Sequence, residues 1–257
     1  MALGLAVALT LVALWRTGLP LHARARRSYL IGGLGLFGSM ILTYWGALHI
    51  HSGLVSVLYG LSPLITGLLA MVWLHEEALT PARLTGMLLG LAGLVAIFGD
   101  SHAAGGPLAT AGVAALLGGV ALQALTLVWL KRVGDDSPPL ATTAGTLVVS
   151  LPLFGLAWWL TGGQVPAVLP AQAGLAIVYL GVFGVFGFAL YYYVIKHMEA
   201  GQVSLITLVT PVFALLLGHL LNGEAISHRV WLGAALIGAG LVLHQWRALS
   251  VVFVRRR

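Results

Sequence analysis

The sequence predicts an all-α protein that crosses a lipid bilayer several times. Its 257 residues are 60% hydrophobic and only 8% charged, whereas a soluble domain carries about 25% charged residues. The apolar residues gather into nine stretches, and short links rich in glycine, proline, aspartate and arginine separate them. A chain with so little polar surface needs lipid rather than water around it, so the composition predicts a polytopic membrane protein.

Each apolar stretch has, or nearly has, the length of about 20 residues that a helix needs to cross the hydrocarbon core. The predicted spans are 1–15, 29–48, 53–74, 84–99, 110–130, 139–160, 173–195, 203–221 and 231–246. The chain has 34 glycines, and small residues let membrane helices approach closely. It has no cysteine, which excludes disulfides, thiolate metal ligands and a cysteine nucleophile.

The basic residues are divided unequally between the two sides that nine alternating spans define. One side collects twelve of the 13 lysines and arginines, and the other has only Arg229. Cytoplasmic loops carry an excess of basic residues, so we expect the twelve and the C-terminus to lie in the cytoplasm. The basic runs at 22–27 and in the predicted tail 248–257 then reflect topology and contact with anionic lipid, rather than nucleic-acid binding.

The two halves of the sequence repeat one pattern at an offset of 148 residues. The matches include residue types that unrelated apolar helices do not share at fixed spacing. They are Gly33 with Gly181, Tyr44 with Tyr192, Gly53 with Gly201, Ser56 with Ser204, Pro63 with Pro211 and Glu76 with Glu224. After one residue is dropped in the following loop, Gly86 matches Gly233 and 92–95 matches 239–242. We therefore expect two repeats, at 1–100 and 108–247.

The repeats are expected to be inverted in the membrane. A unit of five helices, repeated once, must turn upside down because five is odd, and inverted repeats are a common plan of secondary transporters. The second repeat has five predicted helices, but the counterpart of 110–130 would fall before Met1. We therefore expect a ten-helix plan whose first helix is missing here, with a genuine nine-helix protein as the alternative.

Each repeat carries the same motif. A small residue and a serine open a helix ("SGLVS", "AGQVS"), a proline follows seven residues after that serine ("LSP", "VTP"), and a glutamate closes the segment ("HEEALT", "NGEAIS"). The pattern resembles the EamA family of the drug/metabolite transporter superfamily. That resemblance implies two inverted five-helix units that move small metabolites, such as amino-acid-like or drug-like solutes, often outward across the cytoplasmic membrane.

The two repeated prolines mark a predicted solute pathway. Inside a helix, proline removes a backbone hydrogen bond, and the freed carbonyl needs a partner in lipid, so we predict helix kinks at Pro63 and Pro211 that line a cavity. Packing alone is the alternative. Polar side chains nearby would hydrogen-bond a small polar solute: Ser56, Tyr59, Ser62, Thr66, Gln123, Thr126, Ser204, Thr207 and Thr210. For each serine or threonine, the alternative is a bond to its own helix.

The acidic residues argue against catalysis and against carboxylate-based ion coupling. All seven lie in or beside predicted loops, whereas proton and sodium relays use carboxylates within the membrane. We expect no catalytic residue and no cofactor. We also expect no metal site, because the histidines at 49 and 51 have no third ligand in view. Two alternatives to a transporter remain: an enzyme acting on lipid-linked substrates, and an inactive or accessory membrane protein. The oligomeric state stays open, with a homodimer as one alternative.

Overall fold

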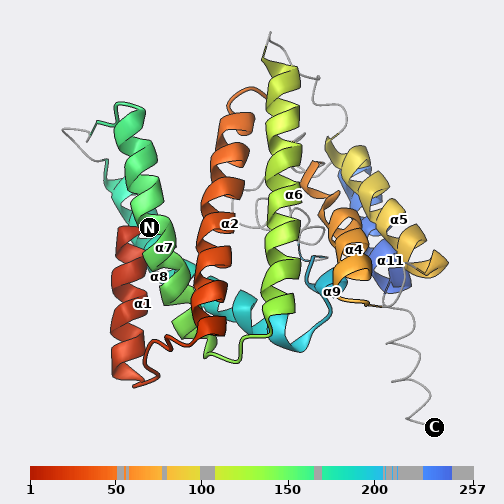
Figure 1. The fold of residues 1–257 in the computed structure, drawn as a ribbon. Coiled ribbons are helices and arrows are strands. Elements are labelled where there is room, and N and C mark those ends of the chain that lie inside the picture. The colour runs from red at the N-terminus through yellow and green to blue at the C-terminus, as the bar shows by residue number, and fades with distance from the viewer. Residues whose placement is uncertain are drawn as a thin grey trace. The chain divides into compact units, whose positions relative to one another are not determined.

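The computed structural model in Figure 1 is all-helical in the part of the chain that it describes. The described residues are 1–50, 55, 58–76, 80–98, 108–164, 170–204, 206, 210, 213 and 228–244. The helices are α1 (Ala2–Leu14), α2 (Ala23–Ala47), α4 (Ser62–Trp73), α5 (Pro81–Phe98), α6 (Ala109–Val133), α7 (Pro139–Leu160), α8 (Ala171–His197), α9 (Ala200–Ser204) and α11 (His228–His244). Helices α2, α6, α7 and α8 are long and apolar enough to cross a membrane.

The helix boundaries follow the apolar pattern closely except where charged residues extend a helix. Helix α7 has the bounds expected for 139–160. Helix α2 begins at Ala23, well before the expected start at 29, because its first turns contain arginines, which are good helix formers. Most of the expected span at 203–221 lies outside the described residues.

The predicted span 53–74 implied one continuous helix around Pro63. The structure instead interrupts the helix just before this proline. The backbone makes a turn at Gly60 and Leu61, and α4 then begins at Ser62 with Pro63 in its first turn. Proline is tolerated there because the first amides of a helix have no intrahelical partner. The interruption lies in the turn directly before Pro63, where a proline removes a backbone hydrogen bond. Pro211 lies outside the described residues, and Pro152, which is not among the predicted kinks, is an interior proline of α7.

The chain divides into two units of closely packed residues, which are described separately. Unit 1 contains residues 1–38 and 129–198, and unit 2 contains residues 39–128 and 199–257. In unit 1, helices α1, α7 and α8 pack around small and medium apolar side chains. These are Ala8, Val12, Leu140, Ala144, Leu147 and Val185. Small side chains at the contact allow the close packing on which helix association in lipid depends.

In unit 2, helices α5 and α11 cross at glycines. A β-carbon on Gly93 would lie 2.5 Å from the carbonyl oxygen of Gly233, and one on Gly240 would meet the carbonyl oxygen of Gly86. Because Gly93 faces Gly233 while Gly86 faces Gly240, the two helices run antiparallel. Ile237, 1% exposed, and Met87, 2% exposed, are buried in this unit.

The contact between α5 and α11 is reciprocal. In the sequence repeat Gly86 matches Gly233, and Gly93 matches Gly240. Each helix therefore presents the same two positions to the other, as in an isologous contact around a two-fold axis.

The segments of α2 and α6 in unit 2 also meet at glycines. A β-carbon on Gly46 would lie 2.6 Å from the carbonyl oxygen of Gly112, and one on Gly119 would lie 2.8 Å from the hydroxyl oxygen of Thr43. Since Gly46 lies near Gly112 and Thr43 near Gly119, these segments run antiparallel. The close approach brings polar side chains of α2 against the backbone of α6.

We expect Gly240→Ala to lower the stability of the protein. The added methyl group would meet the backbone of α5 at Gly86 and Gly90, and overpacking of this kind costs about 1–3 kcal/mol. Gly238→Ala is the matched control, because a β-carbon there would have no atom within 4 Å. The apparent melting temperature of the purified protein in detergent measures both. Equal melting temperatures for the two variants would contradict the close packing of these helices.

Candidate functional site

In unit 2, the predicted pathway residue Tyr59 forms a hydrogen bond with a side chain of another helix. Its hydroxyl hydrogen-bonds the hydroxyl of Thr43 at 2.6 Å, and Thr43 in turn lies against Gly119 of α6. Gln123 follows Gly119 by four residues, so both fall on one face of α6. The structure therefore places Tyr59, Thr43 and Gly119 together, with half-buried Gln123 one turn further along α6.

The first half of α4 contributes two buried hydroxyls. Ser62 is 4% exposed and Thr66 is fully buried. The hydroxyl of Thr66 has no hydrogen-bond partner among the residues that the structure describes. A buried hydroxyl without a partner costs about 1–3 kcal/mol, so Thr66 is a strong candidate for contact with a bound molecule.

Other predicted pathway residues bond to their own helices. Thr126 donates to the carbonyl of Leu122 at 2.7 Å, and exposed Thr210 donates to the carbonyl of Ile206 at 2.8 Å. For these two hydroxyls the structure shows the local alternative. Ser204 ends α9, and its side chain lies outside the described part. Ser56 and Thr207 also lie outside it.

A second polar group in unit 2, which we call the Glu76–Arg83 cluster, joins the ends of three helices. It consists of Glu76, Arg83, Glu199 and the backbone of Ala200. Both carboxylate oxygens of Glu76 accept from the backbone amide of Ala200, at 3.0 and 3.1 Å. The Arg83 guanidinium donates to Glu199 at 2.9 Å. The cluster therefore ties α4 and α5 to the start of α9.

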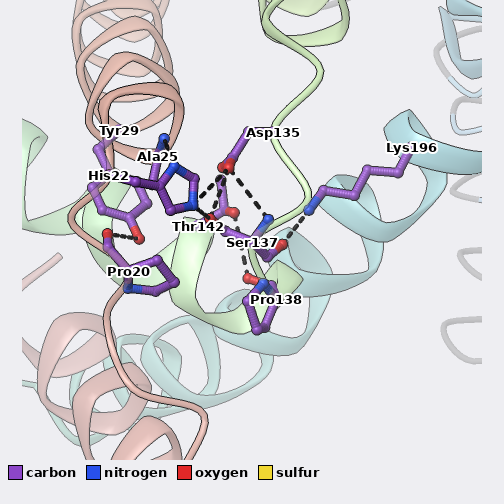
Figure 2. A network of polar contacts seen from close by, with 9 residues as sticks. All are labelled: Pro20, His22, Ala25, Tyr29, Asp135, Ser137, Pro138, Thr142 and Lys196. Atoms are coloured by element: carbon purple, nitrogen blue, oxygen red, sulfur yellow. Dashed lines mark hydrogen bonds and ion pairs between the residues drawn. The ribbon is translucent and has the colours of Figure 1, made fainter.

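A third polar network lies in unit 1, in links of the chain (Figure 2). Asp135 is 6% exposed, and its Oδ1 accepts from the backbone amide and hydroxyl of Ser137, at 3.2 and 2.7 Å. His22 Nδ1 accepts from the amide of Ala25 at 3.2 Å, so a neutral ring carries its proton on Nε2. That nitrogen lies 3.7 Å from Asp135 Oδ1 and 3.4 Å from the Ser137 hydroxyl.

Lysines from two helices extend this network to the end of α8. Lys196 donates to the carbonyl of Ser137, as Figure 2 shows. Lys131 donates to the carbonyls of Ile195, at 3.4 Å, and Met198. These cations also complement the negative end of the α8 dipole. The network fixes the link that precedes α2 to the link that precedes α7, which is a structural role.

Several of these contacts could not be predicted from the sequence alone. Thr43 and the Glu76–Ala200 bond were not foreseen, because their partners are distant in the chain. One signal was available: Glu76 belongs to the repeated motif, and Ala200 begins the second copy of that motif. A glutamate that closes one copy of the motif and a backbone amide that opens the other copy could have suggested the pair.

Comparison with known proteins identifies the family. A model of the EamA-like transporter family matches residues 110–244, just over half of the chain. The chain is 27% identical over 220 residues to an uncharacterized transporter of Archaeoglobus fulgidus, covering 82% of this chain and 75% of that protein. It is 29% identical over 256 residues to the uncharacterized transporter YoaV of Bacillus subtilis, covering 94% and 82% respectively.

Two further similarities bear on function and on fold. The chain is 27% identical over 224 residues to a probable terminal-alkyne amino-acid exporter of Streptantibioticus cattleyicolor, covering 86% of this chain and 73% of that protein. A solved crystal structure, 23% identical, matches with a TM-score of 0.80 over 95% of this chain and 85% of that one. The expected resemblance is thus confirmed: this chain belongs to the EamA-like transporter family and is a multi-pass membrane transporter.

Proposed function

We propose that this transporter moves a small polar solute outward across the cytoplasmic membrane by alternating access between two inverted repeats, 1–100 and 108–247. The observation that carries the proposal is the reciprocal, antiparallel contact between α5 and α11. Inverted repeats require matching helices to run in opposite directions and to exchange equivalent contacts. In this proposal the C-terminal tail lies in the cytoplasm, as the distribution of basic residues predicts.

The chemistry of the pathway residues favours a solute that is recognised by hydrogen bonds. Tyr59, Thr66 and Gln123 offer hydroxyl and amide groups and no formal charge. Such groups suit the polar parts of an amino-acid-like or drug-like solute. The relative in Streptantibioticus cattleyicolor is a probable amino-acid exporter, which supports an amino-acid-like solute and outward movement.

The Glu76–Arg83 cluster supplies a contact that alternating access would break and remake. In our proposal it closes the cytoplasmic side of the pathway by holding α4 and α5 to α9. At the repeat offset, Glu76 corresponds to Glu224 and Ala200 corresponds to Ser52. The equivalent bond in the opposite-facing state would therefore join Glu224 to the amide of Ser52 and close the outer side. Both residues lie outside the described part of the chain.

The same cluster argues against the enzymatic alternative at this position. The carboxylate of Glu76 uses both oxygens on a backbone amide, which is the role of a helix cap rather than of an acid catalyst.

Transport itself is tested with the purified chain in liposomes. We expect counterflow of at least one labelled neutral amino acid or amphipathic drug from a panel, because the pathway groups are neutral hydrogen-bonding groups. Gln123→Leu should lower kcat/KM roughly tenfold, since a lost hydrogen bond of about 1.4 kcal/mol corresponds to that factor. Gln172→Leu is the control, because Gln172 is exposed near the start of α8.

Two outcomes would count against the proposal. Liposomes that show no protein-dependent flux for any compound of the panel would remove the support for a solute carrier of this class. Equal kcat/KM for Gln123→Leu and Gln172→Leu would place the pathway elsewhere.

The gating role is tested by cysteine labelling, which the absence of native cysteine makes clean. A Thr66→Cys reporter is fully buried in this state, so a membrane-impermeant maleimide on the cytoplasmic side should react slowly. Adding Glu76→Ala should raise that rate roughly tenfold, because a hydrogen bond to a charged group contributes about 1.5–3 kcal/mol.

A charge exchange provides the control for the ion pair of the same cluster. Arg83→Glu alone should speed labelling of the reporter, and addition of Glu199→Arg should slow it again. If the rate of labelling from the cytoplasmic side is the same in all of these variants, the cluster is not a gate.

A further inference from the structure

A cavity of about 350 Å³ lies in unit 1, between the first turns of α2 and the last turns of α6. Its volume is at the lower end of the range of small-molecule sites, roughly 300–1,000 Å³. Three arginines line it together with apolar side chains. The lining residues are Arg24, Arg27, Ile31, Trp129, Arg132 and Val133.

The three arginines bring positive charge to one cavity. Within the described part of the chain, no carboxylate forms an ion pair with Arg24, Arg27 or Arg132. Two carboxylates lie nearby in the chain: that of Asp135, whose Oδ1 accepts from Ser137, and that of exposed Asp136.

The dipole of α2 adds to this positive charge, whereas that of α6 partly offsets it. Arg24 and Arg27 lie in the first turns of α2, which has no acidic residue in its first turn. The N-terminus of a helix carries partial positive charge, so cations there are unfavourable unless an anion is present. Arg132 lies in the last turn of α6, where a cation is favourable, and it brings a third guanidinium group to the same cavity. An anion in the cavity would relieve the repulsion among them.

The other walls of the cavity are apolar and include a tryptophan of the kind found at membrane interfaces. Trp129 is 43% exposed, and tryptophan is enriched at the level of lipid headgroups. Ile31 and Val133 complete an apolar surface beside the guanidinium groups. Guanidinium groups bind phosphate oxygens bidentately, while the apolar surface suits a glycerol backbone and the first methylenes of an acyl chain.

We propose that this cavity is a binding site for the phosphate of an anionic phospholipid. The distribution of basic residues requires only that arginines lie on the cytoplasmic side. It does not require three of them to line one cavity with a tryptophan. The proposal concerns residues other than the predicted pathway residues and does not depend on transport.

Native mass spectrometry of the full chain in detergent, titrated with phosphatidylglycerol, tests the site. The double variant Arg24→Gln/Arg27→Gln should weaken the tightest binding event roughly 25-fold, at about fivefold for each arginine near an anionic lipid. The matched control is Arg16→Gln/Arg26→Gln, which removes the same charge at exposed positions that do not line the cavity. The control should retain the tight event.

Brominated phosphatidylglycerol provides a second measurement that needs no loss of arginine. Bromine quenches tryptophan on contact, so the lipid should quench the part of the fluorescence that Trp129→Phe removes, and brominated phosphatidylcholine should quench it less. This comparison keeps the proposal testable if the double arginine variant does not fold.

Three results would overturn the proposal. Equal weakening in the two double variants would indicate diffuse attraction to anionic lipid rather than a site. Displacement of the lipid by millimolar inorganic phosphate would indicate a site for a free anion. Equal quenching of Trp129 by both brominated lipids would show no selectivity for the anionic headgroup.

Discussion

The structure depends on the close approach of helix backbones at glycine. In lipid there is no hydrophobic drive between helices, so association relies on close van der Waals packing and on satisfied polar groups. At Gly93 and Gly240 the neighbouring carbonyl oxygens occupy the space of a side chain. Because the same positions of each repeat make this contact, one packing solution serves both α5 and α11. The same glycine contact is made twice, by two helices that run in opposite directions. This repeated contact is the physical basis of the alternating-access proposal.

The same constraint explains where polar groups are found. A hydroxyl inside a membrane protein needs a partner, and the pairs Thr43–Tyr59 and Thr146–Tyr192, at 2.6 and 2.7 Å, meet that need. Both pairs lie against a glycine, Gly119 in the first and Gly32 in the second. The hydroxyl of Thr66, like those of Thr17 and Ser28, has no partner among the described residues, and in our proposal it contacts the solute.

The all-helical class, the family and several helix boundaries could be predicted because apolar run length and the repeated motif are local properties of the sequence. The extension of α2 back to Ala23 could not be predicted from apolar run length, because arginines break the apolar run without breaking the helix. The kink predicted at Pro63 stays a prediction: the structure has a turn at Gly60 and Leu61, directly before this proline. Thr43 and the arginine-lined cavity could not be predicted, since they depend on which helices meet. The number of spans and the inverted repeats stay predictions.

The orientation of the two repeats tests the central claim most directly. Ala82 and Arg229 occupy equivalent positions at the start of α5 and α11, at the offset that matches Gly86 with Gly233. Single cysteines at these positions can be labelled in intact cells and in inverted membrane vesicles with a membrane-impermeant maleimide. The account predicts that Ala82→Cys reacts only from the cytoplasmic side and Arg229→Cys only from the outer side. Labelling of both from one side would contradict it.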